Sequence, residues 1–363
     1  MTSSRESHRP GLELLRGLAA TAVCFGHVRA FLLPPFRSGG YAWWEQGLYF
    51  LSAQGEAAVW IFLVLSGYLV GGSVLHRRLA GTWSWSDYLL RRSTRLWVVL
   101  LPALGLTFLC DAWRGSSPVV SAGAMATDAS FPRDALTFLG NLFFLQDLLV
   151  APYGSNTPLW SLAYEAWFYL LFPAALVVFF DAGWGRRWFA GLLVLGGLWL
   201  VGPRGWWLAL PWMCGAALAR WEQHLPGRGG VCPRLLPWAG LGAVLGVGPF
   251  LGEALRASLF PMVALATTAL VWSEAARPAL RWPALVRLGA ISYTLYASHM
   301  PVAVLLTTAL AGPAMHVSGA TRWLVVFVAT GALMALAWGL WWVFERRTEV
   351  FRAALLRLRS SRR

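Results

Sequence analysis

Long apolar segments separated by short, arginine-rich polar stretches dominate the chain. A helix that crosses a bilayer needs about 20 mostly apolar residues. Ten segments approach or reach that length, and we predict a helix for each. They cover residues 12–33, 56–75, 96–111, 159–181, 188–202, 205–220, 236–252, 257–275, 288–311 and 322–344. The pattern predicts an all-α polytopic membrane protein, a bundle of about ten transmembrane helices.

A further apolar segment, residues 135–150, is short and carries Asn141, Gln146 and Asp147. It is either an eleventh span or a re-entrant or interfacial piece. Loops that face the cytoplasm are enriched in basic residues. With 135–150 left out of the count and the N-terminus in the cytoplasm, cytoplasmic stretches hold 22 of the 30 arginines and external ones hold six. We therefore predict ten spans, cytoplasmic N- and C-termini, and an external region from about 112 to 158.

The span pattern leaves no room for a sizeable soluble domain. We predict one membrane-embedded domain over residues 1–350 and a basic cytoplasmic tail over 351–363. A tight connection through Pro203-Arg204-Gly205 joins two of the predicted helices. Tryptophans prefer the membrane interface. Interfacial anchoring is accordingly predicted for Trp199, Trp206, Trp207 and Trp212.

Composition supports the membrane class. Of the 363 residues, 58% are hydrophobic and 13% are charged, whereas soluble domains carry about 25% charged residues. The formal charge is +14 and every basic residue is arginine. Because the arginines lie between apolar segments, the charge does not indicate a nucleic-acid partner. The four cysteines show no metal-binding spacing, and neither a metal nor a permanently bound cofactor is expected.

Two ionisable side chains fall inside the first predicted helix. Arg16 and His27 are eleven residues apart, so they share a face at a separation of about 16 Å. Ionisable groups inside a span are costly and indicate function, and an imidazole is suited to taking a proton from an alcohol. The alternatives are an arginine that snorkels to the interface and a core histidine bonded to a backbone carbonyl.

The second predicted helix and the stretch after it carry further candidates. Arg91, Arg92 and Arg95 cluster at the cytoplasmic mouth, where guanidinium groups suit phosphate oxygens. On position alone, an ordinary positive-inside cluster that also binds anionic lipid is the favoured explanation. Gly67 follows Ser66 and stands four residues before Gly71, a spacing that favours close helix packing over exposed backbone beside a ligand.

Two later helices also carry polar groups. Glu165, close after Trp160 and Ser161, lies in the first turns of a helix that starts outside. Its carboxylate can orient a histidine or bond a sugar hydroxyl; favourable placement at a helix N-terminus is the alternative. A polar stripe that includes Ser292, Tyr293, Tyr296 and His299 is consistent with substrate contact or with interhelical hydrogen bonds.

Taken in order, these residues resemble the acyltransferase-3 family of integral-membrane enzymes, which acylate surface polysaccharides and antibiotics. The matching motifs are LELLRGLAA (12–20) with His27, FLVLSGYL (62–69), RSTR (92–95), LWSLAYE (159–165) with FYLLFP (168–173), and LGAISY (288–293) with Tyr296 and HMPV (299–302). The chain departs from the family pattern at Leu14, where glycine is usual, at Ala166, where a second acid is frequent, and at Arg347, where proline is common.

The resemblance implies transfer of an acyl group, most often acetyl, from acyl-CoA to a hydroxyl of an extracytoplasmic glycan at the cytoplasmic (inner) membrane. It assigns roles to ten residues. The catalytic residues would be His27, Glu165 and Arg16; the acyl-CoA-binding residues Arg92, Arg95 and Ser66; and the candidate substrate contacts Trp160, Ser161, Tyr293 and His299.

Some alternatives stay open at the level of sequence. Direct transfer and a covalent acyl-histidine relay are both compatible with the residues. A transporter or flippase of a lipid-linked glycan is the rival function, although the chain lacks the repeat symmetry and paired broken helices typical of transporters. Acceptor choice is expected to depend on loop 34–55 and on residues 112–158.

Overall fold

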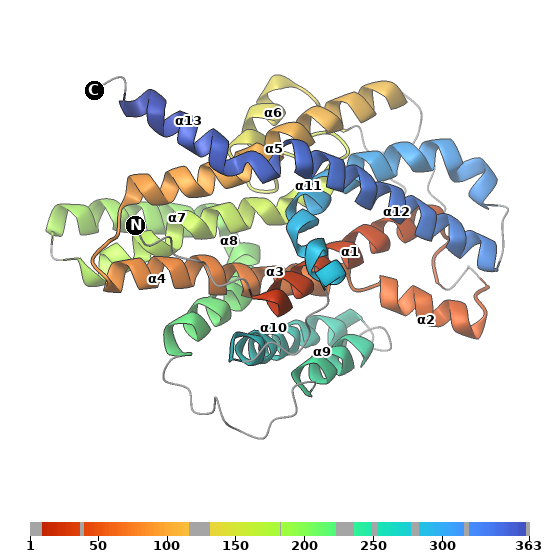
Figure 1. Cartoon of the computed structure of the whole chain (residues 1–363), viewed down its shortest axis with the longest axis horizontal. Coiled ribbons are helices and arrows are strands. Elements are labelled where there is room, and N and C mark those ends of the chain that lie inside the picture. Colours follow the sequence, from red (N-terminus) through yellow and green to blue (C-terminus); the bar gives the residue numbers. More distant parts are fainter. Residues whose placement is uncertain are drawn as a thin grey trace.

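The computed structural model describes residues 9–36, 40–115, 131–181, 183–222, 236–247, 253–276, 283–315 and 319–360. Within these ranges the chain is almost entirely helical and contains no β-strand (Figure 1). The predicted all-α class is therefore confirmed. Each of the ten apolar segments overlaps a helix where the structure describes it; residues 248–252 of the segment 236–252 lie outside the described residues.

Seven long helices make up most of the described residues. They are α1 (Pro10–Leu32), α5 (Trp85–Arg114), α7 (Trp160–Phe180), α8 (Trp184–Trp221), α10 (Glu253–Ala276), α11 (Pro283–Met315) and α12 (Ala320–Val343). Shorter elements connect and extend them. These are α2 (Trp43–Ser52), α3 (Gly55–Ser66), η1 (Gly67–Gly71), α4 (Gly72–Leu79), α6 (Ala135–Leu142), η2 (Thr157–Leu159), α9 (Leu236–Val247), η4 (Glu345–Arg347) and α13 (Thr348–Ser360).

Five helical stretches among the described residues are long and apolar enough to cross a membrane. They are Trp43–Leu79, Trp85–Arg114, Thr157–Phe180, Trp184–Trp221 and Ala320–Arg357. The protein is thus a multi-pass membrane protein. The count of ten spans and the sides of the two termini stay predictions.

Several boundaries differ from those expected. Helix α5 begins eleven residues before the apolar run at 96, and α2 occupies part of the predicted loop 34–55. The predicted basic tail lies largely within α13. The side chain of Trp212 is buried inside the bundle, 2% exposed, so the prediction that it anchors the interface is wrong.

The only helix within segment 135–150 is α6, whose eight residues are too few to cross a bilayer. Asp134 caps this helix by accepting hydrogen bonds from the backbone N–H and the hydroxyl of Thr137. These hydrogen bonds hold the pKa of Asp134 below its usual range. The short length agrees with the non-spanning interpretation.

The predicted turn between the two parts of α8 is a kink. Gly202 adopts φ 58° and ψ −169°, which is outside the helical region, and Pro203 follows it. A residue with a side chain disfavours this conformation, so glycine permits the break. The chain turns at the predicted place, within one residue.

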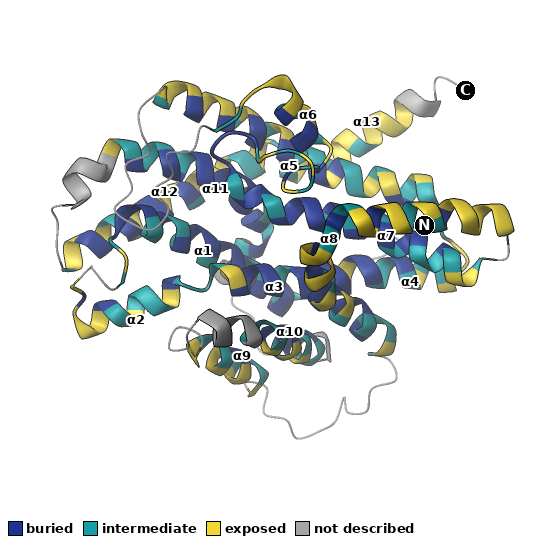
Figure 2. Ribbon diagram, turned by 180° about the vertical axis from the view of Figure 1, so that it is seen from behind, coloured by how far each residue is buried: buried dark blue, intermediate teal, exposed yellow. Residues whose placement is uncertain are grey.

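The first and eleventh helices touch backbone to backbone along the core. A Cβ atom on Gly17 would lie 2.5 Å from Cβ of Leu288, and one on Gly289 would lie 2.4 Å from the carbonyl oxygen of Glu13. Figure 2 shows that buried residues are concentrated in α1, α3 and α11 at the centre of the molecule. This close approach brings functional side chains of α1 and α11 together.

The segment from α3 through η1 packs equally closely on α8. A Cβ atom on Gly67 would lie 1.8 Å from the carbonyl oxygen of Trp212, and one on Gly71 would lie 2.7 Å from Cβ of Ala216. The GxxxG spacing therefore serves close helix packing, as predicted. Element η1 is a π-helix. This form is rare in proteins, and where it occurs it is often near a functional site.

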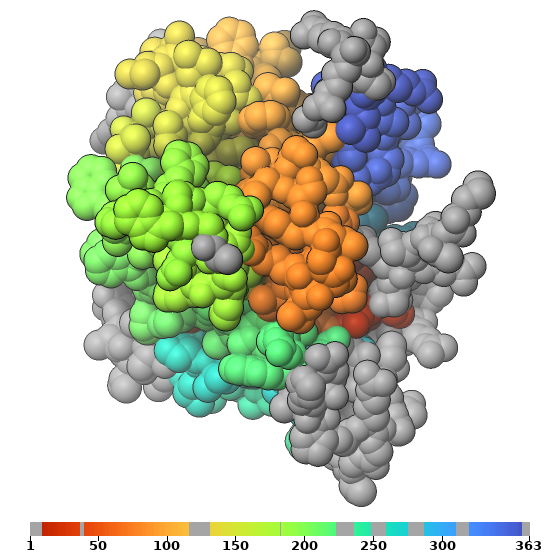
Figure 3. Space-filling model, turned by 90° about the vertical axis from the view of Figure 1, so that its left-hand side faces the viewer, coloured from red at the N-terminus to blue at the C-terminus, as the bar shows by residue number. Residues whose placement is uncertain are grey.

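At one end of the bundle, the turn between α4 and α5 lies beside the end of α7 (Figure 3). An ion pair of 2.8 Å between Nη1 of Arg78 and Oδ1 of Asp181 joins them. By the arginine distribution this is the predicted cytoplasmic end, and α2 lies at the other end of the long axis (Figure 1).

Candidate functional site

An open pocket between α1, α3, α5, α7 and α11 contains about 850 Å³ free of protein atoms. Its lining includes apolar residues of α3, among them Val59 and Leu63, and a set of polar side chains. Seven of the ten predicted site residues are in that lining. They are Arg16, Ser66, Arg92, Arg95, Ser161, Glu165 and Tyr293.

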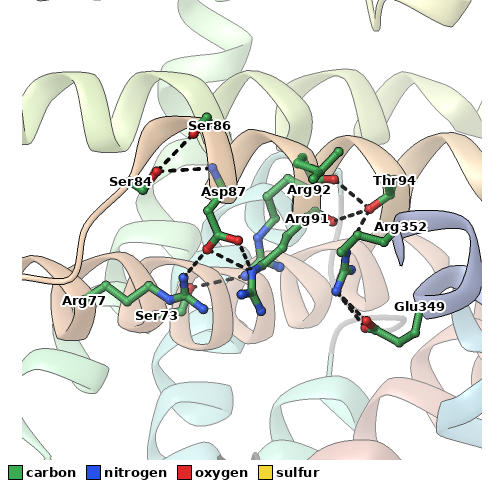
Figure 4. A network of polar contacts seen from close by, with 11 residues as sticks. Ser73, Arg77, Ser84, Ser86, Asp87, Arg91, Arg92, Thr94, Glu349 and Arg352 are labelled. Carbon is green, nitrogen blue, oxygen red and sulfur yellow. Dashed lines mark hydrogen bonds and ion pairs between the residues drawn. The ribbon is translucent and has the colours of Figure 1, made fainter. Parts of the chain in front are cut away.

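The predicted arginine cluster divides into two parts (Figure 4). Arg91 is exposed, and its Nε donates to Oδ1 of Asp87 at 2.9 Å, while Arg77 donates to Oδ2 of the same carboxylate. Arg92 turns the other way: its Nη2 donates to Oγ of Ser73 at 3.2 Å. Only Arg92 and Arg95 of the three line the pocket. Arg91 thus belongs to a surface ion-pair network and not to the site.

The guanidinium group of Arg95 faces the pocket. It makes no hydrogen bond or ion pair within the described part of the chain, whereas Arg16 and Arg92 each bond a hydroxyl. The guanidinium of Arg92 also lies 5.7 Å from the ring centre of Tyr169. Two cationic groups, one of them with its donors available, make this side of the pocket suitable for anionic oxygens.

A chain of hydrogen bonds fixes Glu165 inside the pocket. The Tyr169 hydroxyl donates to Oε1 of Glu165 at 2.6 Å and accepts from Oγ of Ser66 at 3.2 Å. The indole N–H of Trp212 in turn donates to that Oγ at 3.2 Å. The carboxylate is therefore held by a donor one helical turn away and by side chains from α3 and α8.

Arg16 spans the contact between α1 and α11. Its Nη1 donates to Glu13 at 3.1 Å, and its Nη2 donates to Oγ of Ser292 at 3.1 Å. The side chain is only 14% exposed. Because it points into the pocket and bonds α11, it does not snorkel to the interface.

His27 and His299 form a stacked pair across the same helices. Nδ1 of His27 lies 2.8 Å from Nε2 of His299, and the ring planes are 11° apart. Nδ1 of His299 lies 2.9 Å from the carbonyl oxygen of Tyr296. A carbonyl only accepts, so in the neutral ring Nδ1 of His299 carries the hydrogen and Nε2 accepts. His27 must then donate from Nδ1, which leaves the lone pair on its Nε2 available.

Neither histidine lines the pocket, but Tyr296 joins the two regions. Its ring centre lies 6.1 Å from that of His299, and its side chain is in the pocket lining. The Tyr296 hydroxyl donates to the carbonyl of Pro158 at 2.8 Å and lies 2.6 Å from Oγ of Ser161, which donates to it. His27 bonds His299 and Glu165 bonds Tyr169, so the first predicted role of Glu165, to orient His27, has no direct contact behind it. The second predicted role, to bind the acceptor, stays a prediction.

The structure also places the two remaining predicted substrate contacts, Tyr293 and Trp160. The Tyr293 hydroxyl donates to the backbone carbonyl of Leu96 at 3.1 Å, tying α11 to α5. Trp160 lies outside the pocket and lines a second one near the start of α7.

The sequence reasoning missed Tyr169 as the partner of Glu165. The two residues are four apart in one helix, a spacing that places side chains next to each other. That spacing was a usable signal. No such local signal identifies Trp212 as a partner of Ser66, because the two residues lie in different helices and are 146 positions apart in the sequence.

The described residues contain no group of three or more His, Cys, Asp or Glu side chains arranged to hold a metal ion. A family model described as an acyltransferase domain matches residues 9–342 of the chain, a range that includes the pocket and the histidine pair. A comparison with curated proteins and one with solved structures each found no match.

Proposed function

Because the chain belongs to the acyltransferase-3 family, we propose that it is an O-acyltransferase of the cytoplasmic (inner) membrane. It moves an acyl group, in the simplest case acetyl, from cytoplasmic acyl-CoA to a hydroxyl of an extracytoplasmic glycan. The acceptor is an exopolysaccharide, an O-antigen or a lipid-linked oligosaccharide. Family membership also favours an enzyme over a transporter or flippase.

One observation carries this proposal: a single pocket is lined by two guanidinium groups near one end of the bundle and by a carboxylate deeper inside. Arg92 and Arg95 suit the phosphates of the CoA moiety. Ser66 lies in the pocket lining between the two arginines and Glu165, and it hydrogen-bonds Tyr169, which in turn bonds Glu165. Arg16, on the opposite wall, is suited to stabilising negative charge on the thioester oxygen or on the leaving thiolate.

The proposed reaction joins an alcohol to a thioester. The acceptor hydroxyl gives its proton to Nε2 of His27, and its oxygen attacks the carbonyl carbon of the thioester. The carbon–sulfur bond breaks, and the thiolate takes the proton to leave as free coenzyme A. His299 orients His27 through the 2.8 Å contact between their ring nitrogens, and Glu165 binds the acceptor or the pantetheine arm.

This route requires the acceptor to approach from the side of Tyr296, since His27 lies beyond the pocket lining. The acyl-histidine relay differs in one step, because Nε2 of His27 would attack the thioester first. Incubation with labelled acetyl-CoA in the absence of glycan distinguishes the two: the relay leaves acid-labile label on the protein, and direct transfer leaves none.

The function is tested with membranes that contain the full chain, labelled acetyl-CoA and the crude surface-glycan fraction of the cells that make the protein. We expect ester-linked label on the glycan and none with His27→Ala. Replacing Arg92 and Arg95 together with alanine should raise the KM for acetyl-CoA at least tenfold. Arg91→Ala is the matched control and should leave that KM unchanged.

Three outcomes contradict the proposal or part of it. Movement of glycan across the membrane without acylation would support the transporter. Full turnover by His27→Ala would remove the histidine from the mechanism, and an unchanged KM in the double arginine variant would return Arg92 and Arg95 to a role in topology.

A further inference from the structure

A second pocket, with about 640 Å³ free of protein atoms, lies where α3, α7, α8 and α10 meet. Four aromatic and two charged side chains dominate its lining. They are Trp60, Trp160, Trp207, Phe260, Glu56 and Arg204. The family resemblance gives a role to Trp160 alone among them.

The aromatic rings are held in fixed positions. Trp60 is buried, and its ring is stacked on Phe260 with centres 5.3 Å apart and meets Trp207 edge-on at 5.5 Å. Trp207 itself is 43% exposed. Trp60 and Phe260 therefore support Trp207, which presents free ring surface to the pocket.

Arg204 is held in place as well. The guanidinium of Arg204 lies 4.1 Å from the ring centre of Trp160, and its Nη1 donates to Oδ2 of Asp147 at 2.7 Å. Tyr164 donates to the same carboxylate oxygen at 3.1 Å. An arginine fixed by stacking and by an ion pair keeps further N–H donors for a ligand. Glu56, on the α3 side, supplies an acceptor.

This pocket adjoins the reaction pocket at the end away from Arg92 and Arg95. Val59 lines both pockets. Glu56 stands at the start of the helical stretch that ends near Arg77, so the two residues are about 30 Å apart along the helix. The order along the bundle is the arginine pair, Glu165, Val59 and then the second pocket.

The lining fits a sugar better than a lipid chain. A pyranose ring has an apolar face of C–H groups, which suits a tryptophan ring, and an edge of hydroxyls, which suits charged donors and acceptors. An acyl chain, by contrast, carries no polar group that could hydrogen-bond Glu56 or Arg204.

We propose that this second pocket binds one sugar unit of the acceptor and delivers the adjoining hydroxyl toward the reaction pocket. The inference rests on the proposed function for the identity of the acceptor as a glycan. Trp207 is the stacking surface, and Glu56 and Arg204 bind hydroxyl groups. The pocket makes no contact with the CoA donor, so its loss affects acceptor binding and leaves donor binding unchanged.

The test uses the full chain in lipid nanodiscs, with the crude surface-glycan fraction as acceptor probe and saturating acetyl-CoA. Trp207→Ala should raise the apparent KM for glycan by roughly tenfold, the loss expected for one well-packed aromatic contact. The kcat and the KM for acetyl-CoA should not change. Trp207→Phe should recover most of the affinity, and Glu56→Gln should raise the KM for glycan without affecting folding.

Trp206 provides the matched control. It is the neighbouring tryptophan in the same helix, it is 52% exposed, and its N–H donates to the carbonyl of Leu198 outside the pocket. Trp206→Ala should leave both KM values unchanged. Binding is measured separately by saturation-transfer NMR of the glycan fraction, where Trp207→Ala should lose the signal and Trp206→Ala should keep it.

The outcomes separate this inference from the proposed function. A wild-type protein that binds glycan but transfers no acyl group contradicts the function and supports the pocket. Transfer with the same KM for glycan in Trp207→Ala, Glu56→Gln and wild type overturns the pocket. A changed KM for acetyl-CoA, or an activity that follows lipid chain length only when Trp207 is present, assigns the pocket to the donor or to lipid and also overturns it.

Discussion

The tautomer of His27 depends on a single neighbour. His299 is 1% exposed, and its Nδ1 is turned toward backbone carbonyls of its own helix. Its Nε2 therefore accepts from His27. Without that acceptor, the hydrogen of His27 is free to move to Nε2, where it blocks proton abstraction. In the proposed mechanism, His299 therefore acts through His27 as a positioning residue.

We expect His299→Phe to lower kcat for acyl transfer by at least tenfold, because the imidazole of His27 loses its orientation and tautomer. The KM for acetyl-CoA should stay the same. His299→Gln should recover part of kcat, since its amide oxygen can accept from Nδ1 of His27. The kinetics are compared at equal amounts of folded protein.

A purely structural role for His299 would give a different result. Both variants would then lose activity in proportion to their lost thermal stability, and glutamine would not recover kcat at equal folded concentration. A full kcat in His299→Phe would show that the tautomer of His27 does not depend on this contact.

The sequence was sufficient to find most of the polar residues that line the pocket, but not how they pair. The family motifs, and the cost of placing an ionisable group inside a membrane span, identify Arg16, Arg95 and Glu165 one at a time. The contact between His27 and His299 joins residues 272 apart in sequence. It depends on the distance between α1 and α11, which no local pattern gives. Likewise, Arg91 and Arg92 are adjacent in sequence, and only the packed positions of Asp87 and Ser73 separate their roles.

Helix packing at η1 makes a clear prediction at the level of elements. A Cβ atom on Gly67 would lie 1.8 Å from the backbone oxygen of Trp212, and backbone cannot give way without moving α8. We expect Gly67→Ala to lower the free energy of unfolding by about 1–3 kcal/mol. Thermal unfolding of the detergent-solubilised protein measures this as a lower midpoint.

Gly105 is the control, because it lies within α5 and nothing is within 4 Å of a Cβ atom added there. Gly105→Ala should leave the midpoint unchanged or raise it slightly, since alanine favours the helix. An equal fall of the unfolding midpoint in both variants would mean that replacing any helical glycine destabilises the protein, and that the contact between η1 and α8 is not the cause.

The helix boundaries show what the apolar pattern captures. It located the membrane-crossing part of α5 but missed its first turns, which are polar. Ser84 caps those turns by accepting from the backbone N–H of Asp87 at 3.4 Å, and serine at this position is a recognisable signal. Helix α13 was not predicted, because its arginines interrupt the apolar residues and the stretch was interpreted as a basic tail instead of an amphipathic helix. Arg352 of α13 bonds Thr94 of α5 (Figure 4), a contact that only the fold can supply.

Across the whole molecule, the two ends of the bundle differ in chemistry. The end that contains Arg77, Asp87 and Arg91 is a network of ion pairs. The opposite end carries Trp43, 83% exposed, on α2. The arginine distribution predicts that the first end faces the cytoplasm. The proposed donor entry beside Arg92 and the proposed acceptor entry beside Trp207 both depend on this orientation.

Accessibility of single cysteines tests the orientation, in a background where the four natural cysteines are replaced by serine. Arg133→Cys lies in the predicted external region, and Ala353→Cys lies in the predicted cytoplasmic tail; both positions are exposed. A membrane-impermeant maleimide should label Arg133→Cys in intact cells and Ala353→Cys only after permeabilisation. The cysteine-free background reports unspecific labelling.

The two positions decide the span count because they lie on either side of segment 135–150. If that segment crossed the membrane, every later loop would change side, and Ala353→Cys would react in intact cells together with Arg133→Cys. The eight-residue length of α6 argues against such a crossing. Labelling of Ala353→Cys from outside would reverse the positions of Trp160, Arg204 and the second pocket relative to the membrane, and the acceptor would then have to enter from the cytoplasm.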